Sequence, residues 1–173
     1  HADGSPMKAG ETLQQPDLAT VYQEVADQGA NAFYRGRFAR LAARWMEENG
    51  GLITMEDFAN YRPKLREPIV TNYRGHKVVG FPPPSSGGIH VAQMLNILEH
   101  YDLKRFYQED RAKFVNVIAE SMKVAFADRA HWLGDADFVR VPKGLIGKPY
   151  AQQLAKGIDP GKLTPVKGHG APP

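Results

Sequence analysis

Seven consecutive residues separate the clearest β pattern of the chain from its most apolar helical pattern: Pro82, Pro83, Pro84, Ser85, Ser86, Gly87 and Gly88. Three prolines fix φ and remove backbone donors, which makes a stiff, extended lead-in. The two glycines then allow another backbone or a ligand to approach closely. The run can be an anion site, because free N–H groups at a helix N-terminus attract carboxylate or phosphate. It can equally be a structural elbow in which Ser86 caps the next helix, and we favour the structural role.

A β-hairpin is predicted on the N-terminal side of this run. Residues 68–71 and 76–81 are short segments rich in Ile and Val, and residues 72–75 between them have the composition of a turn. No other part of the chain gives a convincing β signal.

Helical spacing accounts for most of the remaining sequence. Toward the N-terminus it predicts a helix that begins at Pro16 and ends before Gly29, a short helical turn over residues 32–34, and an amphipathic helix over residues 38–46. Thr54 followed by Asp57 has the form of a capping box and predicts a short helix through Tyr61.

Three helical regions are predicted after the glycines. The helix that starts near Ile89 has little polar surface and should be buried almost all round. Residues 104–108 should link it to a long helix from about Asp110 to Leu133, with Met122 and Phe126 on the apolar stripe and Glu120 and Asp128 away from it. A last helix is predicted over residues 149–156. The predicted fold class is therefore α+β, mainly helical with one β-hairpin.

Composition excludes several classes of protein. The chain has 22 Lys and Arg against 19 Asp and Glu among 173 residues, a surplus too small for a nucleic-acid binder. No window approaches the roughly 18 to 20 apolar residues of a membrane span. The absence of cysteine removes disulfides, thiolate zinc sites and cysteine nucleophiles. The chain opens at His1 and its last stretch, residues 167–173, has no terminating element, so we expect a piece of a longer protein. Residues 1–6 are either native or partly a cloning scar.

Two groups of residues have the composition of a catalytic or metal site but lack the full pattern. Ser86 and His90 are four residues apart, yet no third acid is present to orient the histidine. His131 lies near Asp128, Asp135 and Asp137, but the spacing matches neither a calcium loop nor a paired-histidine metal site. We therefore expect no metal, no cofactor and no complete catalytic constellation.

The chain resembles the γ-glutamyltransferase (γ-glutamyltranspeptidase) family in consecutive segments from about Ser5 to Ala155. These segments include residues 10–19 (GETLQQPDLA), 33–36 (FYRG), 49–57 (NGGLITMED), 82–90 (PPPSSGGIH), 93–99 (QMLNILE) and 133–139 (LGDADFV). The Pro-Ser-Gly run with its following helix is highly specific to that family.

This resemblance implies a parent enzyme of the N-terminal-nucleophile hydrolase superfamily, with an αββα sandwich fold. Family members are precursors that cleave themselves into a large and a small subunit, and a threonine at the new N-terminus of the small subunit is the nucleophile. Residues 1–173 resemble the C-terminal half of the large subunit as a single segment, with residues 157–173 an irregular linker toward the cleavage site. Thr12, Thr20, Thr54, Thr71 and Thr164 do not occupy the nucleophile motif.

The resemblance places no catalytic or substrate-binding residue in this chain, and it carries over residues 82–88 only as a structural motif. The implied partners are the rest of the large subunit and the small subunit, and the implied substrate is glutathione or a related amide. A periplasmic or secreted location is also implied. A cephalosporin or glutaryl acylase and a non-catalytic helical scaffold remain alternatives. We further expect an exposed apolar surface, because the helices over residues 38–46 and 114–133 cannot be fully covered within this segment.

Overall fold

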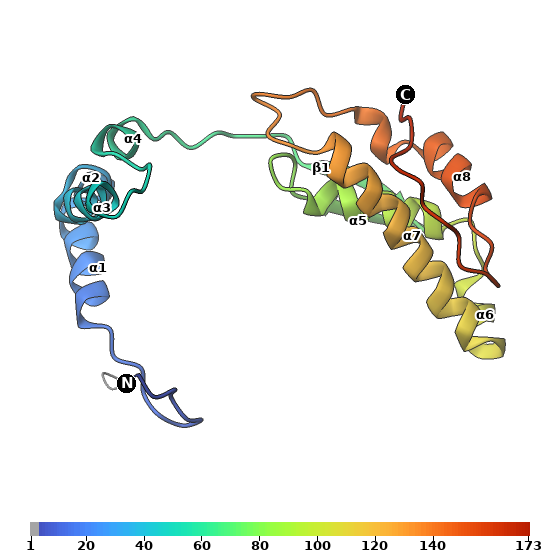
Figure 1. Ribbon diagram of the computed structural model, residues 1–173, viewed down its shortest axis with the longest axis horizontal. Coiled ribbons are helices and arrows are strands. Elements are labelled where there is room, and N and C mark those ends of the chain that lie inside the picture. The colour runs from blue at the N-terminus through green and yellow to red at the C-terminus, as the bar shows by residue number, and fades with distance from the viewer. Residues whose placement is uncertain (1–3) are drawn as a thin grey trace. The chain divides into compact units, whose positions relative to one another are not determined.

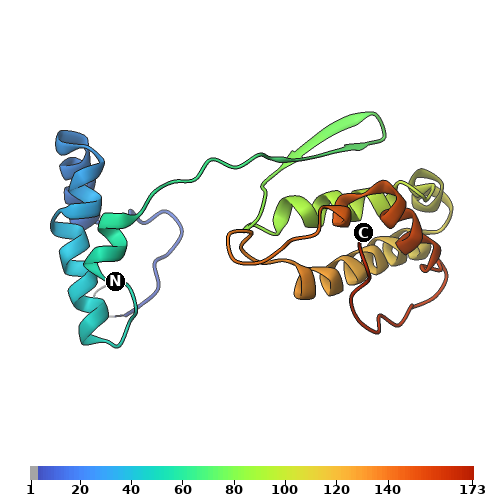
Figure 2. The same cartoon turned by 90° about the horizontal axis from the view of Figure 1, so that it is seen from above.

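The computed structural model describes residues 4–173, and the chain divides into two units, His1–Lys64 and Leu65–Pro173. Residues 4–15 form no helix or strand, as the sequence predicts, while residues 1–3 of the suspected scar lie outside the described part. Figures 1 and 2 show the chain from two directions at right angles. Each unit is described by itself below.

The first unit consists of four helices: α1 (Pro16–Gln28), α2 (Ala30–Arg35), α3 (Arg37–Glu48) and α4 (Met55–Asn60). The four predicted helical segments are thus confirmed, and so is the capping box: Thr54 Oγ1 accepts from the Asp57 N–H at 3.2 Å, and the Asp57 carboxylate accepts from the Thr54 N–H at 2.8 Å. Gly29, with φ of 74°, lets the chain turn between α1 and α2.

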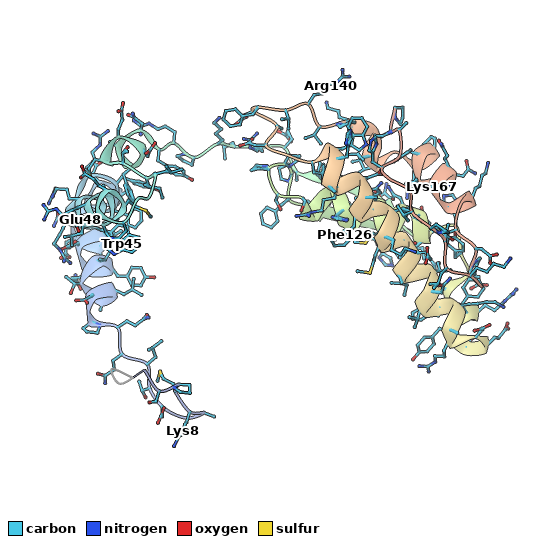
Figure 3. All side chains as sticks on the ribbon, in the orientation of Figure 1. Lys8, Trp45, Glu48, Phe126, Arg140 and Lys167 are labelled. Atoms are coloured by element: carbon cyan, nitrogen blue, oxygen red, sulfur yellow. The ribbon has the colours of Figure 1, made fainter. Side chains whose placement is uncertain are left out.

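Aromatic rings hold the first unit together. The Phe33 ring stacks on Phe38 with centroids 4.7 Å apart, and Phe58 of α4 meets both rings edge-on at 6.2 and 6.1 Å. Among residues 4–64, only Ala32 and Ala39 are fully buried. The outer face of α3 leaves the Trp45 side chain 58% exposed (Figure 3).

The second unit begins with the predicted hairpin, β1 (Ile69–Tyr73) and β2 (His76–Gly80), paired antiparallel from Ile69 opposite Gly80 to Tyr73 opposite His76. The predicted four-residue turn is wrong by two residues, because only Arg74 and Gly75 form it, with φ of 49° and 85°. Two consecutive positive φ angles belong to the tight turns that suit the twist of a hairpin. Arg at the first position is an unusual residue for such a turn, so composition did not indicate it.

Five helical elements follow: α5 (Gly87–Leu98), α6 (Leu103–Glu109), α7 (Arg111–Trp132), the 3₁₀ helix η1 (Lys143–Ile146) and α8 (Lys148–Lys156). Helix α5 lies at the centre, in contact with both strands, α7, η1 and α8. The predicted link over residues 104–108 is wrong, because these residues form α6. Asp102 caps that helix by accepting from the Arg105 N–H at 3.0 Å.

The core of this unit has two apolar clusters on α5. Ile97 packs with Ala151, Ala155 and Ile158, and Ile89 packs with Leu145 and Tyr150. The expectation that α5 is buried is met on most sides, although Val91 is exposed.

A buried amide ties three elements of the second unit together. The Asn96 side chain accepts from Thr71 Oγ1 of β1 at 2.9 Å and donates to the carbonyl of Ile146 in η1 at 2.8 Å. The hairpin and η1 are therefore held against the same helix, α5.

The polar face predicted for α7 is wrong at Glu120 and Asp128, although Lys113 and Lys123 of the same helix are exposed. Glu120 and Asp128, expected to point away from the core, are 0% and 1% exposed, whereas Met122 and Phe126, expected on the apolar stripe, are exposed (Figure 3). The reason is that the two carboxylates find hydrogen-bond donors in distant parts of the chain, including the irregular C-terminal residues. None of the helices within residues 4–173 is long and apolar enough to cross a membrane.

Candidate functional site

The Pro-Ser-Gly run forms a bend between β2 and α5 at which two backbones meet. A Cβ on Gly88 would run into the carbonyl oxygen of Phe81, and a Cβ on Gly80 would lie 2.7 Å from the Cα of Gly88. Gly87 has more room, since its Cβ would meet only Ser85 Oγ at 3.6 Å. Only glycine at position 88 allows the first turn of α5 to lie directly on the end of β2, and this supports the structural role of the run.

Ser86 does not cap α5 with its side chain, so the predicted cap is wrong. Its backbone is already helical, with φ of −78° and ψ of −18°, whereas a capping serine has an extended backbone that aims its oxygen at the first free N–H groups. Ser86 Oγ instead accepts from Arg129 Nε of α7 at 3.0 Å, and Ser85 Oγ accepts from the Gly87 N–H at 3.4 Å.

His90 is buried one turn further along α5. Its ring lies against Phe126 with centroids 4.4 Å apart, and within residues 4–173 its Nε2 atom has no hydrogen-bond partner. Burial, followed by the positive charge of Arg129, lowers the pKa of His90, while Asp128 opposes this shift. Among the described residues no hydrogen bond joins Ser86 to His90 Nε2, so the structure does not pair Ser86 and His90 as nucleophile and base.

Asp128 is the centre of a buried hydrogen-bond network. Its Oδ2 atom accepts from Gln93 Nε2 of α5 at 2.6 Å and from the Tyr150 hydroxyl of α8 at 2.7 Å. Its Oδ1 atom accepts from the Gly170 N–H at 2.6 Å, and the Gly170 carbonyl accepts from Trp132 Nε1 at 3.1 Å. Burial and the neighbouring carboxylate raise the pKa of the Tyr150 hydroxyl, so this group stays a donor.

Glu120 forms a second, similar anchor on α7. Lys123 Nζ lies 2.9 Å from both carboxylate oxygens of Glu120, and the Thr164 N–H donates to Oε2 at 3.2 Å. Lys123 also donates to the Thr164 carbonyl at 2.7 Å. The C-terminal residues, drawn in red in Figure 1, thus run alongside α7 and are bound to it at two points.

The remaining acidic and histidine candidates are engaged elsewhere. The His131 ring stacks on His169 with centroids 3.5 Å apart, and Arg66 pairs with Asp137 at 2.7 Å and with Asp135 at 3.5 Å. Across residues 4–173, no group of three His, Asp or Glu side chains is arranged to hold a metal ion.

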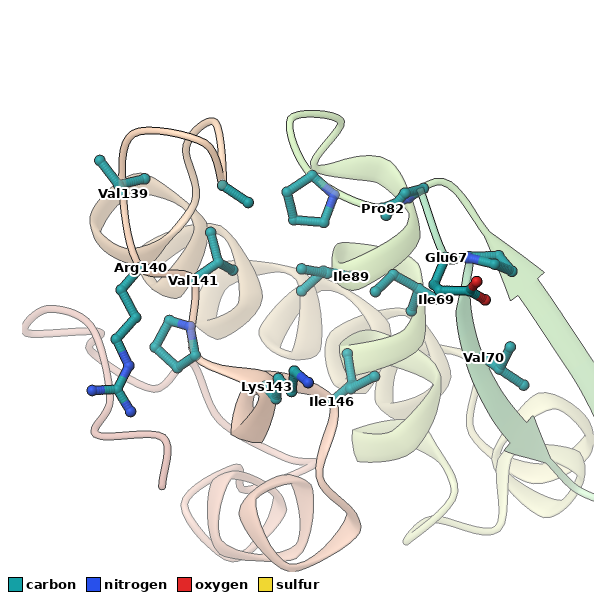
Figure 4. A pocket seen from close by; sticks show the side chains of 14 residues that line it. Glu67, Ile69, Val70, Pro82, Ile89, Val139, Arg140, Val141, Lys143 and Ile146 are labelled. Atoms are coloured by element: carbon teal, nitrogen blue, oxygen red, sulfur yellow. The ribbon is translucent and has the colours of Figure 1, made fainter. Parts of the chain in front are cut away.

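A pocket of about 500 Å³ opens beside the elbow (Figure 4). Pro82 and Pro83 line one part of it, and apolar side chains of the hairpin, α5 and η1 line most of the rest, Ile69, Ile89 and Ile146 among them. The charged lining residues are Glu67, Arg140 and Lys143. The pocket can hold an apolar group, and its lining includes no Ser, Thr or Cys side chain. Residues 136–143 form its other wall, and nothing in the sequence indicated that they line a pocket.

Comparison with known proteins identifies the family. The family model described as "Gamma-glutamyltranspeptidase" matches residues 1–172. The chain belongs to the γ-glutamyltranspeptidase family. It is 45% identical to the "Glutathione hydrolase proenzyme" of Escherichia coli strain K12 and 46% identical to the "Acylase ACY 1 proenzyme" of Pseudomonas sp. strain SE83, over 96% and 87% of its length respectively.

A solved member of the family has the same fold. The γ-glutamyltranspeptidase of Helicobacter pylori superposes with a TM-score of 0.83 and 43% sequence identity, over 90% of this chain and 45% of that chain. The predicted fold class, mainly helical α+β with one hairpin within the family's fold, is confirmed. The chain spans only 31% and 27% of the two curated proenzymes.

Three threonines of this segment have local structural roles. Thr20 Oγ1 donates to the Pro16 carbonyl at 3.0 Å, Thr54 caps α4, and Thr71 Oγ1 donates to Asn96. None of these three hydroxyls lies at a chain terminus, where an α-amino group could serve as its base. The geometry of the described residues therefore fits a supporting segment of a γ-glutamyltranspeptidase-like protein.

Proposed function

We propose that residues 1–173 form the C-terminal half of the large-subunit region of a γ-glutamyltransferase precursor. The observation that carries this proposal is the combination of an almost full-length family match with coverage of only 31% of the E. coli glutathione hydrolase proenzyme. The parent enzyme then transfers or hydrolyses the γ-glutamyl group of glutathione and related amides, through a threonine nucleophile outside this segment.

The proposed chemistry has two steps. The threonine hydroxyl oxygen forms a bond to the γ-carbonyl carbon, its proton passes through the threonine's own α-amino group to the departing amine, and a γ-glutamyl ester remains on the enzyme. Water or the amine of an acceptor amino acid then attacks the ester and releases the threonine. Water gives hydrolysis and an amino acid gives transfer.

The segment itself is proposed to be inactive. Ser86 and His90 are not paired, and the residues from 4 to 173 hold no metal-binding group of three acidic or histidine side chains. Its proposed part in the enzyme is structural: it contributes the elbow, the hairpin and the helices as a scaffold. Its proposed partners are the rest of the large subunit and the small subunit. Exposed apolar side chains such as Trp45 and Phe126 are candidates for those contacts.

The test is to assay the whole precursor on a γ-glutamyl anilide, with residues 1–173 alone as the control. The precursor should release the aniline and should be cut into two chains, whereas the segment should do neither. A coding sequence without a threonine shortly after Pro173 would contradict the proposal, as would activity of the segment alone.

An acylase activity of the parent is the second candidate, because the identity to the Acylase ACY 1 proenzyme is as high as that to the glutathione hydrolase. A γ-glutamyltransferase must hold the α-amino and α-carboxylate groups of its substrate, and a glutaryl acylase needs no such clamp. Preference for a glutaryl amide over the γ-glutamyl anilide would therefore favour the acylase. A precursor with a degenerate nucleophile that cleaves neither substrate would favour the non-catalytic scaffold.

A further inference from the structure

The C-terminal residues 163–173 contain no helix or strand, yet they are attached to the second unit at defined points. Thr164 is bound to Glu120, and Gly170 is bound to both Asp128 and Trp132. The two carboxylates are eight residues apart on α7, which corresponds to roughly 12 Å along the helix axis. The six residue-to-residue steps from Thr164 to Gly170 can span about 20 Å when extended, so the C-terminal residues reach both carboxylates without being fully stretched.

The anchors are strong because both carboxylates are buried. A buried charge must be matched by hydrogen bonds, and an unmatched one is costly. Asp128 is 1% exposed, and its Oδ1 atom accepts from the Gly170 N–H at 2.6 Å. Its Oδ2 atom is already occupied by Gln93 and Tyr150. If Gly170 moved away, Asp128 Oδ1 would lose the backbone N–H donor that residues 163–173 supply.

Residues 163–173 also pack closely against α8 and η1 at two glycines. A Cβ on Gly170 would collide with the Tyr150 hydroxyl, and a Cβ on Gly144 would collide with the carbonyl oxygen of Pro173. A Cβ on Gly168, by contrast, would meet nothing within 4 Å. Residues 163–173 thus approach the rest of the unit closely at Gly170 and Pro173, and His169 stacks on His131, whereas Gly168 has free space around its Cα.

We propose that Glu120 and Asp128 are positioning residues that hold residues 163–173, the C-terminal strap, against α7 and so fix where the chain leaves Pro173. The functional consequence rests on the proposed function. If the precursor is cut after residue 173, the strap fixes the position of Pro173 and so the position of the residues that lead to the cleavage site. Neither carboxylate touches reacting atoms, so their role is positional and not catalytic.

Two matched glycine variants of the 173-residue chain test the strap. Gly170→Ala should push the strap off Tyr150, and Gly168→Ala should leave it in place. Hydrogen–deuterium exchange followed by mass spectrometry should show roughly 10-fold faster exchange of strap amides in Gly170→Ala, the factor expected from losing a hydrogen bond to a charged group. Strap exchange in Gly168→Ala and α7 exchange in both variants should match the wild type. Equal strap exchange in all three proteins would overturn the proposal.

A second pair of variants separates positioning from general stability. Asp128→Asn keeps the side-chain shape but replaces one acceptor oxygen with an NH₂ group, which cannot accept from Gly170, Gln93 or Tyr150. Asp102→Asn, at the cap of α6, makes the same change of charge where Asn caps as well as Asp. Strap exchange should rise only in Asp128→Asn. Because Asp128→Asn also weakens the bonds from Gln93 and Tyr150, the amides of α7 should accelerate with the loss of stability of the unit. Strap amides that accelerated by less than the amides of α7 would overturn the proposal.

The consequence for processing is tested in the whole precursor. Gly170→Ala should slow conversion into two chains by roughly 10-fold relative to Gly168→Ala, the same factor as for strap release. A released strap with unchanged cleavage would overturn the positioning role. A wild-type precursor that is never cut would contradict the proposed function, and the exchange experiments would still decide whether the strap is held by Asp128.

Discussion

Residues 4–64 and residues 65–173 have similar helical patterns in sequence, but they bury very different amounts of side chain. In the first unit only Ala32 and Ala39 are fully buried, and large residues on α3 such as Leu41 and Trp45 remain exposed. The second unit buries Ile97, Leu145 and a set of polar side chains. An amphipathic pattern therefore specifies a helix, while burial depends on which neighbours are present. The chain spans less than a third of the length of the curated proenzymes that it matches.

The largest difference between the units should be seen by truncating one apolar side chain in each. Ile97→Ala removes a fully buried side chain packed against α8 and should lower the free energy of unfolding by about 2–5 kcal/mol. Trp45→Ala removes a larger but mostly exposed side chain and should change it by less than about 0.5 kcal/mol. Urea unfolding followed by circular dichroism measures both. An equal loss of unfolding free energy in Trp45→Ala and Ile97→Ala would contradict the difference in burial between the two units.

A smaller effect is expected from changing Asp128, a buried carboxylate with no counterpart among residues 4–64. Asp128→Asn weakens hydrogen bonds from neutral donors to a charged acceptor and should lower the free energy of unfolding of the second unit by about 1.5–3 kcal/mol. Asp102→Asn should leave it within about 0.5 kcal/mol, since Asn is an equally good helix cap. Thermal unfolding of the two variants side by side decides this. Equal melting temperatures would contradict the role given to the network.

The smallest effect should come from His90, whose pKa is lowered below its ordinary value of 6.5 by burial. The unfolded chain then binds a proton more readily than the folded chain, so stability is fully present above about pH 6.5 and falls as the pH drops toward the lowered pKa. His90→Gln should flatten this pH dependence of stability. The control variant His100→Gln, at an exposed position, should not flatten it. The measurement is the urea midpoint between pH 7.5 and pH 5. An unchanged slope in His90→Gln would show that His90 is not the group responsible.

Local signals in the sequence were sufficient for most of the elements. Helical spacing, Gly29 as a terminator and the Thr54–Asp57 capping box predicted the helices of the first unit, and β-branched runs predicted the hairpin. Helix α6 was missed although Asp102 followed by Arg105 contained its cap, because residues 104–108 are largely polar and lack a clear apolar stripe.

The parts that could not be predicted depend on contacts between residues far apart in the chain. Nothing near Glu120 or Asp128 indicates burial, since Thr164 and Gly170, which lie more than 40 residues away, supply some of their donors. The pocket beside Pro82 depends in the same way on residues 136–146 folding back to the elbow. The family resemblance identified residues 82–88 as a motif, and the geometry of Gly88 supplies a physical reason for its glycine.

The most direct test of the account is the chemical identity of the products when the whole precursor matures. Intact-mass analysis and N-terminal sequencing of the purified protein should find two chains, with residues 1–173 uncut in the larger one and threonine as the first residue of the smaller one. The mature protein should then hydrolyse a γ-glutamyl anilide. A precursor that stays in one piece, a cut within residues 1–173, or a new N-terminus other than threonine would contradict the assignment of this segment to the large-subunit region of a γ-glutamyltransferase.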